Sequence, residues 1–388
     1  MKSELIEYVK KSRLVYSLYF YVMSLGVKLL RVFVKTDSRL ILFVSYGGRH
    51  FNDSPKCIYE AIKNDKRFDG YKFVWAFRNP DIFPPDIQKI KIDTLNYYLT
   101  ALRARVWITN VHMERGLDFK GKNTYYLHTT HTVLPKLMAK HALVAGSENF
   151  APLCTYKFDC SCAQSEYEQK LQADMYDLPI DRIKLVGYPK NDILVNFPEN
   201  RKAEIKKELG IDSGKKIILY APTYRDEKNN RQLCPINFDV WENILGDGYM
   251  VLFRAHPIVV SMTRIDPSSS FVKDVSEYPF NTDLMAVSDI LISDYSGIFF
   301  EFGVQNKPMF CYAYDYDEYT SRRGLYFDIR DVIPGGHMSE EELISYIKNG
   351  DMKEIMSKCD SFKKEQITVF GHATADCIDI IAQNIGIV

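Results

Sequence analysis

The sequence predicts an α/β protein made of two Rossmann-like domains, each built around a parallel sheet. Short apolar runs typical of strands alternate with helix-like segments from Leu40 to Tyr312. A charged stretch at 196–216 interrupts this alternation, and a hinge between two domains is expected there. A chain of 388 residues is long enough to give both domains complete cores.

Composition and charge argue against a nucleic-acid-binding protein and against a cysteine metal site. Hydrophobic residues make up 46% of the chain, which is ordinary for a globular protein. Lys+Arg and Asp+Glu both number 50, so the chain lacks the overall basic charge of a nucleic-acid-binding protein. The eight cysteines include no CxxC pair, so free thiols in a reducing compartment are expected and no metal site is predicted. Whether the reaction uses a metal ion is left open.

Residues 1–36 form a segment of their own. The run from Leu14 to Val27 carries no charge, and basic residues flank it on both sides. It is shorter than the roughly 20 residues that a membrane-spanning helix needs, and no signal-peptide cleavage site is evident. A basic helix rich in Tyr and Leu is typical of a segment lying in an anionic membrane surface. We therefore predict a membrane-associating amphipathic segment; a helix packed on the protein is the alternative.

The first domain is predicted over 37–202. Its apolar runs predict strands at 40–45, 73–77, 89–92, 106–109, 125–130, 156–163 and 183–186. Helices are expected after Pro55, near 134–142 and from Ser165.

The second domain is predicted over 203–388. Its strands are expected at 216–220, 250–254, 271–273, 290–292 and 309–312, and its tail is expected to be helical at 340–348 and 362–382. Loops at the carboxyl ends of parallel strands bind ligands in folds of this kind. Ligands are therefore expected in a central cleft that the two parallel sheets face.

The stretch from Asp289 to Glu301 is the strongest candidate for a phosphate site. It reads as a short strand, the turn Ser293–Gly297 and the start of an apolar helix. Free backbone N–H groups at such a helix start attract phosphate. Asp294 or Ser296 is expected to cap the helix, and Glu301 to accept bonds from ribose hydroxyls. An ordinary capped turn between strand and helix is the alternative.

Two histidines follow the strand predicted at 125–130. His131 lies where the chain turns from strand to helix, so it can reach a cleft and act as a general base. His128 is expected to lie still on the strand and is the weaker candidate. For each, the alternative is a structural histidine whose ring nitrogens are hydrogen-bonded within the core.

A second cationic group follows the strand predicted at 250–254. Arg254 and His256 are separated by one residue, so both can point to the same side, and Pro257 fixes the turn. An arginine and a histidine at a strand end suit recognition of a diphosphate. The loop after the preceding strand adds the hydroxyl of Thr223 and the cation Arg225. A buried arginine paired with a carboxylate is the alternative for Arg254.

Six stretches resemble the CDP-glycerol glycerophosphotransferases that build teichoic acids and similar capsule polymers. They are Ser45–Pro55 (SYGGRHFNDSP), His128–Lys136 (near TWHGTPLK in the family), Gly187–Asp192 (GxPRND), Tyr220–Arg225 (YAPTYR), Arg254–Pro257 (RxHP) and Ser293–Glu301 (SDYSSxxFE). The set covers about residues 40–330 in the right order. The length of the chain looks more like the primase-type members than the long polymerases.

The resemblance implies a GT-B fold without a DxD metal motif. It implies transfer of a polyol phosphate from CDP-glycerol, or from a CDP-ribitol-like donor, to a hydroxyl of a lipid-linked saccharide or polymer, with release of CMP. No tightly bound cofactor is implied, and the implied location is the cytoplasmic face of the membrane. A glycosyltransferase that uses a nucleotide sugar on the same fold is the alternative, as is a non-catalytic scaffold.

The resemblance also assigns individual residues. It carries His131 over as the catalytic histidine of the first domain and His256 as the histidine at the donor pyrophosphate. The implied donor-binding residues are Pro222, Thr223, Arg225, Arg254, Ser293, Asp294, Ser296, Gly297 and Glu301. The implied acceptor-side residues are Gly47, Gly48, His128, Lys136 and Asn191.

The sequence departs from the family pattern in three places. Thr132 and Val133 replace a glycine and a threonine in the loop that is expected to face the acceptor. Gly297 replaces a serine, which removes a hydroxyl and keeps the backbone N–H. Lys190 replaces an arginine, which keeps the charge and loses the bidentate geometry.

Overall fold

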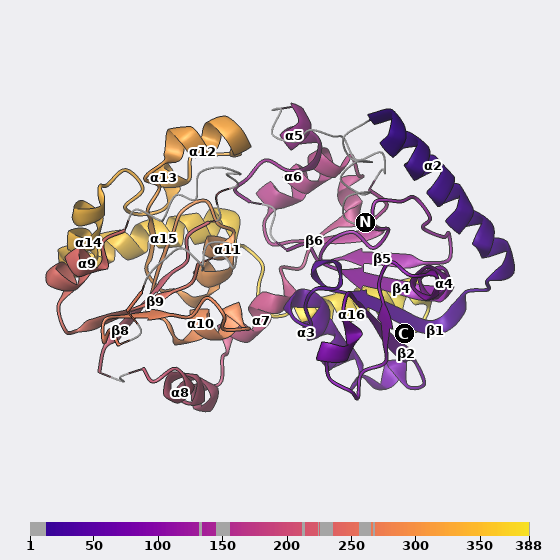
Figure 1. Ribbon diagram of the computed structural model, residues 1–388, viewed down its shortest axis with the longest axis horizontal. Helices are drawn as coiled ribbons and strands as arrows, with labels where there is room; N and C mark the ends of the chain where they lie inside the picture. Colours follow the sequence, from indigo (N-terminus) through magenta and orange to yellow (C-terminus); the bar gives the residue numbers. More distant parts are fainter. Residues whose placement is uncertain are drawn as a thin grey trace. The chain divides into compact units, whose positions relative to one another are not determined.

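The computed structural model describes residues 13–131, 134–144, 156–211, 214–223, 225, 236–255, 265–266 and 268–387. The chain divides into two compact units (Figure 1). Unit 1 comprises Met1–His131, Met138–Asp192 and Gly371–Val388, and unit 2 comprises Thr132–Leu137 and Ile193–Phe370. Each unit is described by itself.

Unit 1 contains a seven-stranded parallel sheet in the order β3-β2-β1-β4-β5-β6-β7. Its strands are β1 (Asp37–Val44), β2 (Lys72–Phe77), β3 (Lys89–Lys91), β4 (Ala104–Thr109), β5 (Tyr125–His128), β6 (Cys160–Ala163) and β7 (Ile183–Leu185). The strand order reverses between β1 and β4, which makes this the place where a ligand is expected in such a sheet. The predicted strands are confirmed, although β6 begins only at Cys160.

The strands of unit 1 are apolar along their length because helices cover the sheet. The main helices are α3 (Asp53–Ile62), α4 (Leu95–Arg103), α5 (Ala139–Val144), α6 (Glu166–Tyr176), α7 (Pro189–Val195, whose last residues belong to unit 2) and α16 (Ala373–Ile385). In the core, the ring of Trp75 stacks between those of Phe43 and Phe77, with centroids 5.2 and 5.7 Å away. This packing holds the carboxyl ends of β1 and β2 in place, next to the turn that is described below as part of the candidate site.

The C-terminal helix belongs to unit 1, whereas the sequence placed it in the second domain. Cys377, Ile378 and Ile381 on α16 pack into the unit 1 core. The Asp192 carboxylate accepts the N–H groups of Gly371, Ala373 and Thr374 and so holds the start of this helix. Packing of its apolar face against the first sheet therefore decides which unit α16 joins, although the helix follows unit 2 in the sequence.

Unit 2 contains a five-stranded parallel sheet in the order β10-β9-β8-β11-β12. Its strands are β8 (Lys216–Tyr220), β9 (Tyr249–Phe253), β10 (Val272–Asp274), β11 (Ile290–Ser293) and β12 (Met309–Cys311). Its helices are α8 (Glu199–Glu208), α9 (Phe238–Leu245), α10 (Asn281–Val287), α11 (Ile298–Phe302), α12 (Tyr316–Arg323), α13 (Ile329–Val332), α14 (Glu340–Asn349) and α15 (Met352–Gln366). The strand order reverses between β8 and β11. Two parallel α/β sheets are therefore confirmed.

The boundary between the units also differs from the predicted hinge. The charged stretch 196–216 contains α8, which belongs to unit 2. Arg201 of α8 forms an ion pair with Asp283 of α10 (3.1 Å). The charges of this stretch therefore face solvent and a neighbouring helix, and the change of unit comes earlier, after Asp192.

A short strap, defined here as the described residues 134–137, belongs to unit 2 although the chain on either side belongs to unit 1. Lys136 forms an antiparallel bridge with Leu325. The Leu137 N–H donates to Gly324 O (3.2 Å), and the Tyr326 N–H donates to Pro135 O (2.9 Å). The helix predicted near 134–142 therefore begins only at Ala139, because the strap is extended and paired.

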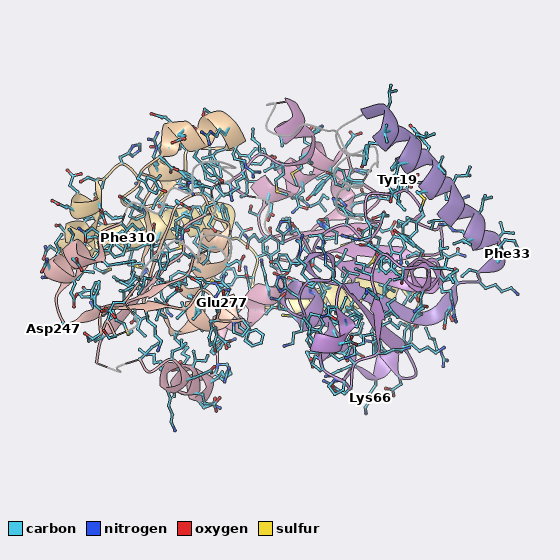
Figure 2. The ribbon with its side chains drawn as sticks, in the orientation of Figure 1. Tyr19, Phe33, Lys66, Asp247, Glu277 and Phe310 are labelled. Carbon is cyan, nitrogen blue, oxygen red and sulfur yellow. The ribbon has the colours of Figure 1, made fainter. Side chains whose placement is uncertain are left out.

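Helix α2 (Arg13–Leu30) runs along the outside of unit 1 and continues into a 3-10 turn at Arg31–Phe33 (Figure 1). Its outer face exposes large apolar side chains: Leu14, Leu18, Tyr21, Val22, Leu25 and Leu29. Tyr19 and Phe33, labelled in Figure 2, are exposed as well. The helical stretch Leu14–Phe33 has 20 residues and is long and apolar enough to cross a membrane by length and composition, so the expectation that it is too short was wrong. The helix extends past the uncharged run to Leu30, and Lys28 in its last turn and Arg31 directly after it bind residues of unit 1.

Candidate active site

In unit 1, the point where the strand order reverses is built by the turn after β1 and by the residue after β4. Gly47 and Gly48 both have positive φ, 61° and 80°. A Cβ on Gly48 would lie 3.0 Å from the Arg78 nitrogen and 3.1 Å from Ala76 O. The glycines thus let the turn fold tightly over the end of β2. This turn brings the Tyr46 N–H to the Asn110 Oδ1 acceptor at 2.9 Å.

His131 lies beside this turn and is half-buried. Its Nδ1 is 3.1 Å from the backbone oxygen of Asn110, and its ring contacts the Tyr46 ring with centroids 6.0 Å apart. A carbonyl oxygen can only accept, so Nδ1 carries the proton. When the ring is neutral, Nε2 is therefore the nitrogen that can accept a proton, as a general base requires.

A buried ion pair supports the same region. Lys190 Nζ lies 3.4 Å from Asp53 Oδ2, with only 6% and 7% of the two side chains exposed. Lys190 Nζ also donates to the backbone oxygen of His131 (3.4 Å), and Asp53 accepts the Tyr46 hydroxyl (2.9 Å). Burial raises the pKa of Asp53, but Lys190 and the Ser54 N–H outweigh it and leave the pKa below its ordinary value. Asp53 is therefore charged. It is linked to the His131 ring through Tyr46 and to the His131 backbone oxygen through Lys190.

His128 and Asn191 lie inside unit 1, which differs from the acceptor-side position expected for them. His128 Nδ1 is 3.0 Å from Ser161 Oγ, and its ring stacks on Phe158 with centroids 4.0 Å apart. Burial, with the nearby histidines, lowers its pKa well below the ordinary value. Asn191 is fully buried and donates to Gln164 Oε1 (3.4 Å). Both side chains belong to an internal polar network.

In unit 2, the matching point lies between β8 and β11. The Ser293 hydroxyl donates to Ala221 O (2.6 Å), and Asp294 Oδ1 accepts the N–H groups of Thr223 (2.8 Å) and Tyr295 (2.7 Å). Asp294 therefore ties two strand ends together and does not cap α11, contrary to one expectation. Ser296 Oγ accepts the Ile298 N–H (3.2 Å), so the serine supports the start of the helix.

Arg225 is held by two carboxylates. Its Nη2 lies 2.9 Å from Asp294 Oδ2, and its Nε and Nη2 make a bidentate pair with Asp315 at 2.6 and 2.8 Å. Its guanidinium also lies against the rings of Tyr295 and Tyr319. Burial lowers the pKa of Arg225, but the charge of Asp294 and the Asp315 bonds raise it well above its ordinary value. The residue expected to bind donor phosphate thus cross-links the loops around the site.

Arg254 is directed toward a loop of its own unit. Its Nη1 donates to Val275 O (3.1 Å) and Tyr278 O (2.7 Å). Burial lowers its pKa, and Glu277, labelled in Figure 2, acts in the opposite direction. The guanidinium is thus anchored through one nitrogen. His256, its expected partner, lies outside the described residues.

The remaining donor-side residues surround the turn after β11. Thr223 Oγ1 is buried without a hydrogen-bond partner in the part of the chain that the structure describes, so a ligand could bind it. Gly297 has φ −62° and ψ −9°, a conformation open to any residue. Glu301 lies in the first turn of α11, and both Pro222 and Glu301 are half-buried.

Lys136 lies in unit 2, near Asp294, Arg225 and Arg323, and its Nζ is 6.0 Å from the centroid of the Tyr319 ring. The sequence had assigned it to the acceptor side with residues of the first domain. The physical reason for the difference is the pairing of the strap with Leu325.

The sequence did not identify several residues that build the points of strand-order reversal in the two units, among them Asn110, Asp53 and Asp315. Asn110 directly follows a predicted strand, and so it satisfies the rule that identified the other candidates. Asp53 and Asp315 carried no such signal, because their partners are distant in the chain; Asp315 is 90 positions from Arg225. Within the described ranges, no group of three His, Cys, Asp or Glu side chains could hold a metal ion.

Comparison with known proteins gives consistent results. A family model described as CDP-Glycerol:Poly(glycerophosphate) glycerophosphotransferase matches residues 27–370. A teichoic acid poly(glycerol phosphate) polymerase of Staphylococcus epidermidis is 32% identical over 346 residues, 84% of this chain and 47% of that protein. A teichoic acid glycerol-phosphate transferase of Staphylococcus aureus is 32% identical over 322 residues, 77% of this chain and 80% of that protein. The chain thus spans about half the length of the first relative.

Two further similarities bear on the fold and on the polyol. The solved structure of the wall teichoic acid polymerase TagF is 29% identical, and the match covers 93% of both chains with a TM-score of 0.80. It confirms the predicted fold. A teichoic acid poly(ribitol-phosphate) polymerase of Bacillus spizizenii is 33% identical over 224 residues, 55% of this chain and 34% of that protein.

Proposed function

The chain belongs to the CDP-glycerol:poly(glycerophosphate) glycerophosphotransferase family, and we propose that it transfers glycerol phosphate from CDP-glycerol to a hydroxyl of a lipid-linked saccharide or polyol-phosphate polymer. The observation that carries this proposal is the bond between His131 Nδ1 and Asn110 O, which assigns the proton of the neutral ring to Nδ1 and the basic lone pair to Nε2. A transferase of this kind needs such a base for the acceptor hydroxyl.

The reaction is an in-line phosphoryl transfer. His131 Nε2 takes the proton of the acceptor hydroxyl, and the oxygen forms a bond to the β-phosphorus of CDP-glycerol. The bond from that phosphorus to the oxygen bridging the two phosphates breaks, and CMP leaves with the electron pair. Catalysis of this type depends on positioning and on stabilising the developing charge.

Unit 2 supplies the groups that suit a nucleotide diphosphate. The Ser296 hydroxyl, the Thr223 hydroxyl and the backbone at Gly297 border one turn. Arg254 and His256 follow the adjacent strand β9 in sequence. Each hydrogen-bond donor aimed at the developing charge should contribute on the order of 3 kcal/mol.

A nucleotide-release assay, which measures CMP from CDP-polyols and CMP-sugars and UDP from UDP-sugars, tests the proposed reaction. CDP-glycerol, CDP-ribitol, CMP-sugars and UDP-sugars are each supplied with a lipid-linked disaccharide or with a polyol-phosphate polymer. We expect CMP release from CDP-glycerol with one of these acceptors and no turnover of the sugar donors. Turnover of a nucleotide sugar without turnover of any CDP-polyol would overturn the proposal.

Ribitol phosphate is the second candidate for the transferred group. The similarity to a poly(ribitol-phosphate) polymerase favours it. The same assay separates the two, because faster CMP release from CDP-ribitol would assign the longer polyol.

Helix α2 is proposed to hold the protein at the cytoplasmic face of the membrane as a peripheral enzyme. Its inner face is tied to unit 1 by the bond from the Asp118 N–H to Ser24 Oγ (2.9 Å) and by the ion pair of Lys28 with Asp118 (2.7 Å). A helix held along its length in this way presents its apolar outer face sideways to a surface. Exposed leucines would enter the lipid, and basic residues near anionic headgroups would add about 1 kcal/mol each.

Vesicle sedimentation tests this placement. A variant with Leu14→Gln, Leu18→Gln and Leu25→Gln should fold normally and lose binding to anionic vesicles. Ile82→Gln with Leu95→Gln is the matched control, because these exposed apolar side chains lie outside α2. Equal sedimentation of the triple variant and the parent would contradict the proposal. Resistance of the membrane-bound parent to alkaline carbonate would point instead to a spanning helix.

A further inference from the structure

The strap places one lysine beside the donor-side turn of unit 2. Lys136 is half-buried, and its charged neighbours are Asp294 after β11, Arg225 after β8 and Arg323 on α12. Gly324 has φ +66°, which favours glycine, and a Cβ there would lie 2.5 Å from Leu137 Cδ1, so the loop and the strap are in close contact at this position. The position of Lys136 is thus set by the backbone bonds of unit 2.

A second lysine of the same unit provides an internal comparison. Burial lowers the pKa of both Lys136 and Lys307 to about 8. Lys307 Nζ donates to Ala286 O (3.1 Å), Ser288 O (2.6 Å) and Gln305 Oε1 (3.2 Å), so its three donors are used. Within the described residues, Lys136 Nζ makes no hydrogen bond or ion pair; it lies 6.0 Å from the centroid of the Tyr319 ring, with Asp294 as its carboxylate neighbour. Burial of an ammonium without a partner is unfavourable.

We propose that Lys136 is a ligand of the donor's diphosphate. Three cations, Lys136, Arg225 and Arg323, gather around the carboxylates of Asp294 and Asp315. Arg225 is committed to both carboxylates, whereas Lys136 Nζ makes no hydrogen bond or ion pair within the described residues and can meet an anion. An ammonium binds phosphate as a compact point charge. The inference rests on the proposed function and makes it more specific. It assigns Lys136 to the donor-binding residues, whereas the resemblance assigned it to the acceptor side.

Titration calorimetry of the full chain tests this assignment with CDP-glycerol, CDP and cytidine. Lys136→Met should weaken binding of CDP-glycerol and CDP by on the order of 10- to 100-fold, the range for a hydrogen bond to a charged group. It should leave cytidine affinity unchanged, because the nucleoside carries no phosphate. Lys136→Arg should restore part of the lost affinity. The melting temperature should stay at or above that of the parent, because an unpaired buried charge is removed.

Lys307→Met is the matched control. It should lower the melting temperature, since three acceptors lose their donor, and it should leave CDP-glycerol affinity unchanged. Equal affinity of the parent and Lys136→Met for CDP-glycerol would overturn the inference alone. Equal losses for cytidine and CDP-glycerol would also overturn it, because the effect would then be structural. A parent that binds neither CDP-glycerol nor CDP would overturn the proposed function together with this inference.

Discussion

Asn110 in unit 1 and Asp294 in unit 2 occupy matching places and differ by one charged group. Each residue directly follows the second strand at the point where the strand order reverses. Asn110 Oδ1 accepts the Tyr46 N–H from the turn after β1 (2.9 Å), and Asp294 Oδ1 accepts the Thr223 N–H from the loop after β8 (2.8 Å). One backbone arrangement is thus held by an amide in one unit and by a carboxylate in the other.

The difference shows how one arrangement serves two kinds of chemistry. The neutral Asn110 adds no charge, and its backbone oxygen orients His131. The carboxylate of Asp294 attracts Arg225, which in turn binds Asp315. Unit 1 therefore presents a histidine beside a neutral amide, whereas unit 2 presents a charged cluster. The fold creates one such point in each sheet, where the strand order reverses, and the side chains there determine its chemistry.

The largest expected effect comes from breaking the charged cluster. Arg225→Ala would leave the carboxylates of Asp294 and Asp315 without their shared cation. Loss of one partner of a buried ion pair costs about 3–5 kcal/mol, and we expect that loss in the free energy of unfolding, measured in urea. Arg322→Ala is the control, because its pair with Glu318 is exposed and should contribute under about 1 kcal/mol. A result for Arg225→Ala as small as the control's would contradict the ion-pair account.

Exchanging the two matching side chains should have intermediate and unequal effects. Asn110→Asp would set a second carboxylate beside Asp53, whose pKa Asn110 helps to lower. We expect a loss of about 2–3 kcal/mol in the free energy of unfolding. Asp294→Asn keeps an acceptor for the Thr223 N–H and leaves Asp315 on Arg225, so about 1–2 kcal/mol should be lost.

The pH dependence of Asn110→Asp sharpens this comparison. Neighbouring like charges raise the pKa of carboxyl groups in the folded state. A raised folded pKa favours the folded variant at low pH, and that contribution disappears as the pH rises through it. The deficit of Asn110→Asp relative to the parent should therefore shrink from pH 7 toward pH 4. A deficit that stays constant over this range would show that charge is not its cause.

The smallest expected effects concern donor binding at the turn after β11. Gly297 has an ordinary helical conformation, so Gly297→Val should fold normally, and any lost affinity reports crowding of the ligand. Ser296→Ala should weaken CDP-glycerol binding by about 1–2 kcal/mol, and Gly297→Val should weaken it more. Calorimetry measures both changes. Normal binding by Gly297→Val would exclude close approach of phosphate to this backbone.

The sequence predicts the strands and most of the site positions, because apolar runs and the polar residues after them are local signals. It places His128 on the strand and ranks it below His131, and β5 does end at His128. It does not predict the partners of His128, Phe158 and Ser161, which come from a later strand region. It also misplaces the strap and α16, because antiparallel pairing with Leu325 and packing in the unit 1 core are long-range events. The bonds of Arg225 to Asp294 and Asp315 are not predicted for the same reason.

The central claim is that unit 1 supplies the base for the acceptor and unit 2 binds the donor. His131→Ala and His256→Ala should each reduce transfer by at least about a hundredfold. Calorimetric titration with CDP-glycerol separates their contributions most directly. The account predicts nearly unchanged donor affinity for His131→Ala and clearly weaker affinity for His256→Ala. Equal losses of affinity in the two variants would contradict it.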